Sequence, residues 1–218
     1  MKTLTLKVLV AAALAATSLS SWSAEPVAAG AVVQANLPAD AFIKEITNEV
    51  FAAVKGDKAI QSGDLRKIIA LIETKIIPHV NFQRMTASAV GRNWRQATPE
   101  QQKRLQEEFK NLLIYTYAGA AAQIKDQTVE YKPMRNRPED TEVVVRSVVR
   151  GQGEPIQIDY RLEKAGTAWK VYDVNVLGAW LVQTYQSSFA QEVSASGIDG
   201  LIAKLAERNK QLAAKKPR

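Results

Sequence analysis

The stretch WKVYDVNVLGAWLVQTY, residues 169–185, decides the fold of this chain. It opens with a strand-forming run, breaks at Gly178, and resumes with a pattern typical of a helix. Successive strand residues point to opposite faces, so the run predicts two sets of side chains. One set is Trp169, Val171, Asp173 and Asn175, and the other is Tyr172, Val174 and Val176.

Three segments upstream of this stretch also show the period of two that is typical of strands. They are residues 128–134, 141–149 and 156–163, and residues 168–176 complete the set. The segment 156–163 alternates cleanly, with Ile156, Ile158 and Tyr160 on its apolar face. Short connections such as residues 164–167 join antiparallel neighbours. We therefore predict a four-stranded, mostly antiparallel sheet.

Helical periodicity flanks these strands on both sides. It predicts helices at about 39–55, within 62–78, at 81–91, at 98–125, at 179–194 and at 199–212. Thr98, Pro99 and Gln101 form a capping box that starts the longest of them. Helices followed by an antiparallel meander and more helices indicate the α+β class.

The two ends of the chain have a different composition. Residues 1–23 have the basic start, short apolar run and small residues of a secretory signal peptide. Residues 24–38 predict a flexible leader, residues 39–212 a single domain, and residues 213–218 a basic tail. No second apolar run reaches the roughly 18 residues that a membrane helix needs, so we expect an exported, periplasmic product.

Composition narrows the possible chemistry. The chain has no cysteine, which excludes disulfides and thiolate catalysis, and no metal or cofactor site is expected. His79 is the only histidine, and no nucleophile elbow or phosphate-binding glycine loop accompanies it. The net charge of +7 is spread along the chain without a concentrated basic motif, so no nucleic-acid partner is expected.

Asp173 is the one residue that suggests an enzyme. A carboxylate in an apolar cavity can act as a general base on a small ketone, as in ketosteroid isomerases, with Tyr160 or Tyr172 as the oxyanion donor. Alternatively, Asp173 accepts hydrogen bonds that fix the corner between the sheet and the following helix. Because the sequence offers no second placed acid, we favour the structural role.

The apolar surface exceeds what one helical layer on a small sheet requires. The second half of the helix at 98–125 is apolar nearly all round, and the helix after Gly178 is also apolar. Either a second helical layer covers this surface, or the sheet and helices enclose a cavity for an apolar ligand. A ligand-free adaptor with fully packed faces is the corresponding third functional hypothesis.

The order and spacing of three segments resemble the MlaC-like (toluene-tolerance) family of periplasmic phospholipid-binding proteins. The segments are residues 76–120, 169–189 and 197–205. The resemblance implies an NTF2/cystatin-like domain with added helices around an apolar lipid cavity, and a carrier role without catalysis. It also implies a glycerophospholipid cargo that moves between an outer-membrane lipoprotein complex and an inner-membrane ABC transporter with a ring-forming lipid-binding subunit, maintaining outer-membrane lipid asymmetry.

The resemblance also directs attention to the residues expected to contact lipid. The first candidates are the inward strand face and the strand-to-helix corner: Ile156, Ile158, Tyr160, Val174, Val176 and Ala179. The second group is Val143, Val145, Leu112, Leu113 and Tyr117. At the corner, relatives often carry a small polar residue where this chain has Trp180, whose indole would narrow the pocket, cap it or pack outward.

Overall fold

The computed structural model describes residues 37–135, 137 and 139–214. The predicted signal peptide (1–23), residues 24–36 of the predicted leader and residues 215–218 of the predicted tail lie outside them. Within the described ranges, no helix combines the length and apolarity needed to cross a bilayer.

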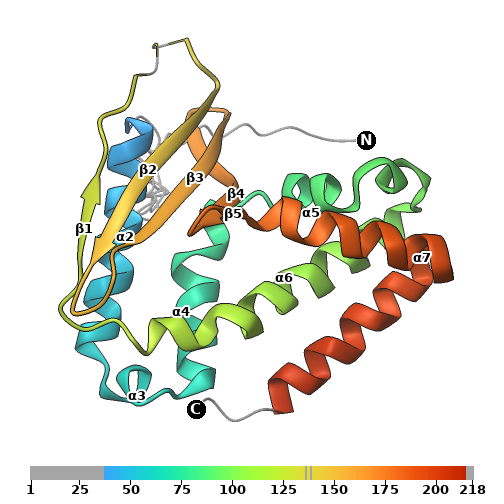
Figure 1. Cartoon of the computed structure of the whole chain (residues 1–218), viewed down its shortest axis with the longest axis horizontal. Coiled ribbons are helices and arrows are strands. Elements are labelled where there is room, and N and C mark those ends of the chain that lie inside the picture. Colours follow the sequence, from blue (N-terminus) through green and yellow to red (C-terminus); the bar gives the residue numbers. More distant parts are fainter. Residues whose placement is uncertain (1–36, 136, 138, 215–218) are drawn as a thin grey trace, which may run out of the picture.

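The sheet has five strands in the order β1-β2-β3-β4-β5, each antiparallel to its neighbours (Figure 1). The strands are β1 (Thr128–Tyr131), β2 (Glu142–Arg150), β3 (Ile156–Ala165), β4 (Ala168–Val176) and β5 (Ala179–Trp180). The α+β class and the antiparallel sheet are thus confirmed, but the count of four strands is wrong. Because β5 has only two residues, it has no period that a sequence pattern can reveal.

The helices surround this sheet unevenly. They are α2 (Ala39–Gly56), α3 (Lys58–Gln61), α4 (Leu65–Lys75), α5 (Phe82–Val90), α6 (Pro99–Ala121) and α7 (Leu181–Ala214), with 3₁₀ turns η1 (Ile77–His79) and η2 (Gly91–Gln96). In Figure 1, α2 lies along the sheet and α4 lies beside one end of it, whereas α5, α6 and α7 form a helical lobe to one side, with the end of α6 returning toward the sheet. The capping box at the start of α6 is present, with Thr98 and Gln101 bonded to each other's backbone N–H groups.

A break at Gly197 divides α7 into two antiparallel halves that pack along α6 (Figure 1). Gly197 has φ 72° and ψ −176°, a conformation open essentially only to glycine. The two helices expected at 179–194 and 199–212 correspond to these halves, except that residues 179 and 180 belong to β5.

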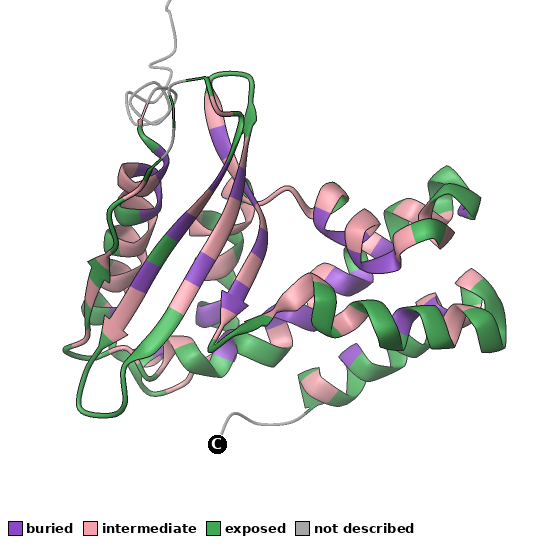
Figure 2. Cartoon of the chain, turned by 45° about the horizontal axis from the view of Figure 1, so that its top comes forward, coloured by how far each residue is buried: buried purple, intermediate pink, exposed green. Residues whose placement is uncertain are grey.

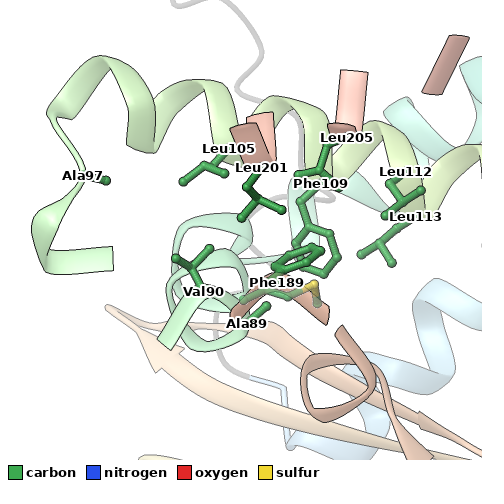
Figure 3. Packing of buried hydrophobic residues seen from close by; sticks show 11 residues of the cluster. Ala89, Val90, Ala97, Leu105, Phe109, Leu112, Leu113, Phe189, Leu201 and Leu205 are labelled. Carbon is green, nitrogen blue, oxygen red and sulfur yellow. The ribbon is translucent and has the colours of Figure 1, made fainter. Parts of the chain in front are cut away.

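Three separate groups of buried side chains make up the core. The first joins α5, α6 and α7 around Phe109 and Phe189, whose rings meet edge-on at 5.2 Å (Figure 3). The second packs Phe42 and Ile43 of α2 against one face of the sheet. The third joins α2, α3, α4 and the end of α6 around Val54 and Ile68.

A β-bulge at Tyr172 reverses the faces of β4 midway along the strand. Arg161 pairs with Asp173, but its neighbour Leu162 pairs with Val171, which leaves Tyr172 as the extra residue. Burial still alternates residue by residue along β4 (Figure 2). Trp169 and Val171 are buried on one face of the sheet, and Asp173 and Asn175 are buried on the other. The prediction that Asp173 shares a face with Trp169 and Val171 is therefore wrong.

The register assigns the two faces of the sheet. The face toward α2, here called the inner face, carries Val145, Tyr160, Leu162, Val171 and Val174. The opposite, outer face carries Arg161, Glu163, Asp173 and Asn175. Tyr172 also faces outward, since its hydroxyl donates to Glu142 at 3.1 Å and its ring lies 3.6 Å from the Arg84 guanidinium.

Replacing Gly197 with Ala tests the break in α7. The methyl group has open space around it, but the left-handed φ remains unfavourable, so we expect a loss of about 1–3 kcal/mol in unfolding free energy. Gly119→Ala is the matched control, because this exposed α6 position is helical and also has open space, and it should gain about 1 kcal/mol. Urea unfolding followed by circular dichroism measures both. Equal effects of the two substitutions would contradict the account of the break.

Candidate functional site

An apolar pocket of about 510 Å³ lies on the inner face of the sheet, where the sheet meets α2, α4 and α6. The sheet contributes Val149, Ile156, Ile158, Tyr160, Val174 and Val176. The helical walls contribute Val50, Phe51, Ile72, Leu113, Ile114 and Tyr117, among others. Its volume falls within the roughly 300–1,000 Å³ typical of small-molecule sites.

The described residues that line this pocket include no Asp, Glu, Lys or Arg. Its polar side chains are Gln123 and Gln127 near the end of α6, together with the tyrosines. Burial raises the pKa of Tyr160, so its hydroxyl stays protonated at neutral pH. Such a wall favours a ligand portion that carries no charge and few polar atoms.

The pocket lies at the junction of the three core groups. Leu113 belongs to the group of α5, α6 and α7, and Tyr160 packs on the group between α2 and the sheet. Val50 and Ile72 pack on the third group. Because each wall is fixed by a different cluster, closing the pocket would require these clusters to move relative to one another. Close-packed interiors resist such shifts.

Seven of the predicted lipid-contact residues lie on the pocket wall: Ile156, Ile158, Tyr160, Val174, Val176, Leu113 and Tyr117. Tyr117 and Ile156 are 42% and 41% exposed, so the pocket opens to solvent beside them. These positions agree with the predicted cavity, and their contact with lipid remains a prediction.

The other four predicted residues lie elsewhere. Val143 and Val145 are buried against α2, and Leu112 is buried in the core group that joins α6 and α7. Ala179 is exposed in β5. The placement of these four on the pocket wall is therefore corrected. The valines do share the inner face, but Phe42 and Ile43 cover them.

Sequence reasoning missed the wall formed by α4 and η1. Ile72, Ile76 and Ile77 all line the pocket. Ile72 and Ile76 lie in the segment 62–78, whose apolar periodicity predicted a helix, but such periodicity alone does not distinguish a pocket wall from a packed core. In α2, Val50 and the neighbouring Phe51 both line the pocket, and neither was among the predicted lipid contacts.

Asp173 lies on the outer face, away from the pocket. The side chain is 1% exposed, and its carboxylate accepts hydrogen bonds from Arg161 Nη1 at 3.0 Å, Val174 N at 2.9 Å and Val182 N at 3.1 Å. Burial raises the pKa of Asp173, while the Val182 N–H and the Arg161 guanidinium oppose that rise. Val174 and Val182 lie on either side of the corner that links β4 to α7, and Arg161 reaches the carboxylate from β3.

Trp180 covers this corner from outside. Its ring lies 3.8 Å from the Arg161 guanidinium, which in turn pairs with Asp173. Of the three expectations for Trp180, the structure shows outward packing. Asn175 completes the corner, since its side-chain oxygen accepts from the Gly178 N–H at 2.8 Å. The described residues also include no group of three or more His, Cys, Asp or Glu side chains placed to hold a metal ion.

Comparison with known proteins places the chain in context. A family model described as MlaC protein matches residues 44–207. The toluene tolerance protein ttg2D of Pseudomonas putida is 27% identical over 168 residues, which is 77% of this chain and 78% of that protein. The intermembrane phospholipid transport system binding protein MlaC of Haemophilus influenzae is 18% identical over 173 residues, 78% of this chain and 81% of that protein.

A solved structure shares the fold at higher identity. It is the phospholipid-binding protein from Ralstonia solanacearum in complex with a phospholipid, with 49% identity and a TM-score of 0.78. The match covers 81% of this chain and 99% of that chain.

Substitutions at Asp173 test its structural role. Asp173→Ala should lower the unfolding free energy by about 3 kcal/mol, because it removes the acceptor for Arg161 and for two backbone N–H groups. Asp173→Asn should cost less, since the amide oxygen still accepts from the two backbone N–H groups. Chemical denaturation measures both variants. If Asp173→Ala unfolds at the same denaturant concentration as the wild type, Asp173 does not hold the corner.

Proposed function

The chain belongs to the MlaC family, and we propose that it is a periplasmic carrier of glycerophospholipids. In this proposal the acyl chains are buried without covalent chemistry in the pocket on the inner face of the sheet. The headgroup stays at the opening, outside the apolar wall.

The observation that carries this proposal is the pocket of about 510 Å³ whose described lining has no charged side chain. Each CH₂ group moved from water into such a wall gains about 0.8 kcal/mol, so a long acyl chain is a suitable occupant. The Ralstonia solanacearum relative supports the choice of ligand, since that protein was solved with a phospholipid.

The carrier would shuttle lipid between the two membranes and so maintain outer-membrane lipid asymmetry. It would exchange cargo with an outer-membrane lipoprotein complex and with an inner-membrane ABC transporter that has a ring-forming lipid-binding subunit. Export would follow from the predicted signal peptide at residues 1–23. The Haemophilus influenzae relative, named as a binding protein of an intermembrane phospholipid transport system, supports this assignment.

The isomerase hypothesis has less support. Its proposed base, Asp173, is 1% exposed on the outer face, whereas Tyr160 lies on the pocket wall of the inner face. A general base has to reach its substrate within hydrogen-bond distance, and Asp173 already binds three protein donors. The open pocket likewise argues against an adaptor with fully packed faces.

Native mass spectrometry of protein purified from cells without added lipid tests the carrier directly. We expect a bound species whose mass excess corresponds to phospholipid, identified after extraction by tandem mass spectrometry. Protein that is folded and consistently free of lipid would refute the carrier function.

A pair of neighbouring β3 substitutions tests the location of the pocket. Ile158→Lys places a charge on the apolar wall and should remove at least about nine-tenths of the co-purified lipid, because a buried unpaired ammonium is strongly disfavoured. Gln157→Lys is the matched control on the outer face, where the new ammonium can bind Asp159, which already accepts from Gln157 at 2.9 Å.

Lipid content per folded protein is the measurement for this pair, with circular dichroism to confirm that both variants fold. Equal lipid content in the two variants would show that the acyl chains bind elsewhere.

A further inference from the structure

Leu177 combines an unusual backbone with an unusual exposure. It is the first residue of the two-residue turn between β4 and β5, with φ 53°, followed by Gly178 with φ 90°. Of the non-glycine residues that the structure describes, it is the one with positive φ. The side chain is also 68% exposed.

Neither property is explained by the turn itself. A two-residue hairpin with positive φ at both positions ordinarily uses Asn, Asp or Gly at the first position. Leucine is strained in this conformation, because its Cβ approaches the following carbonyl oxygen. Because the side chain is exposed, it also gains little burial energy that would offset this strain. Backbone strain at a residue that also exposes apolar surface therefore suggests a functional role for that residue.

The turn adjoins the pocket. Val176, the residue before Leu177, lines the pocket, and the Leu177 N–H donates to the Gln157 carbonyl at 3.0 Å. The residues on either side of Gln157, Ile156 and Ile158, also line the pocket. Leu177 is therefore tied to the strand segment that forms the pocket wall.

The distribution of exposed apolar side chains supports the same location. Within the described part of the chain, the exposed large hydrophobic residues are Tyr117, Ile156 and Leu177. Tyr117 and Ile156 line the pocket, and Leu177 follows a residue that does. Such residues are normally scattered over a surface, so their gathering around one pocket marks its opening.

We propose that Leu177 and Ile156 form an apolar lip, which a phospholipid acyl chain contacts as it passes between a membrane and the pocket. This inference rests on the proposed carrier function and adds a kinetic role to it. The lip shortens the stretch over which the leaving chain meets only water, and so lowers the barrier to transfer. The occupant is an acyl chain because the lip is continuous with a wall that lacks charged residues.

Leu177→Asn separates a role in lipid transfer from a role in stability, because it should raise the melting temperature while it slows transfer. Asparagine tolerates the left-handed conformation, so the variant should melt about 2–4 °C higher than the wild type. Loss of an apolar contact equivalent to about two methylene groups should slow lipid transfer by roughly tenfold. Leu177→Met is the control, since it keeps an apolar side chain at the same φ and should transfer at nearly the wild-type rate.

The assay follows transfer of a fluorescent phosphatidylethanolamine from donor vesicles with a quencher to acceptor vesicles of phosphatidylethanolamine and phosphatidylglycerol. The lip is supported if Leu177→Asn slows transfer while co-purified lipid per folded protein stays at the wild-type level. It is refuted if Leu177→Asn transfers at the wild-type rate, which would leave Leu177 as a strained turn residue or a contact for a partner protein. If the wild type carries no phospholipid, the carrier function itself fails, and this outcome is separate from a failure of the lip.

Discussion

The three hydrogen bonds that Asp173 accepts determine how the chain leaves the sheet. Two of them come from the residues on either side of the reversal, Val174 in β4 and Val182 in α7, and the third comes from Arg161 on the neighbouring strand. Together they fix the start of α7 on the outer face of the sheet. Since Leu181 nevertheless lines the pocket, this corner also sets the position of one lining residue. Asp173 resembles a catalytic base in the sequence, but in the structure its carboxylate holds the corner between β4 and α7.

The bulge at Tyr172 lets one short strand serve two different surfaces. Before the bulge, Trp169 and Val171 face α2, and after it Val174 and Val176 still face inward toward the pocket. If β4 kept the same residues but alternated regularly, with Tyr172 paired in the ladder, one of these pairs would point outward and Asp173 would share the face of Trp169 and Val171. The polar residues Tyr172, Asp173 and Asn175 instead all lie on the outer face. There Arg84 stacks on Tyr172, Arg161 pairs with Asp173, and Asn175 accepts from the Gly178 N–H.

The sequence predicted the features that depend on local periodicity and did not predict those that depend on register. The four long strands, the capping box at Thr98 and the break before residue 199 follow from patterns within one segment. The bulge and β5 depend on pairing between strands, which a period of two does not report. The same limit explains which residues of the pocket could be predicted from the sequence. Val174 and Ile158 could be predicted, but Val145 was misplaced because the position of α2 over it is a tertiary fact.

The pocket is not part of any one core group, because its walls come from three of them. A void of this size inside a single cluster would lower the free energy of unfolding, because the surrounding side chains could not fill it completely. Here three clusters are each closed by their own large side chains, such as Phe109, Phe42 and Ile68, and they leave an apolar space where their edges meet. The surface left uncovered in this way is the apolar excess that the sequence already showed. A bound acyl chain would fill the apolar space where the three clusters meet.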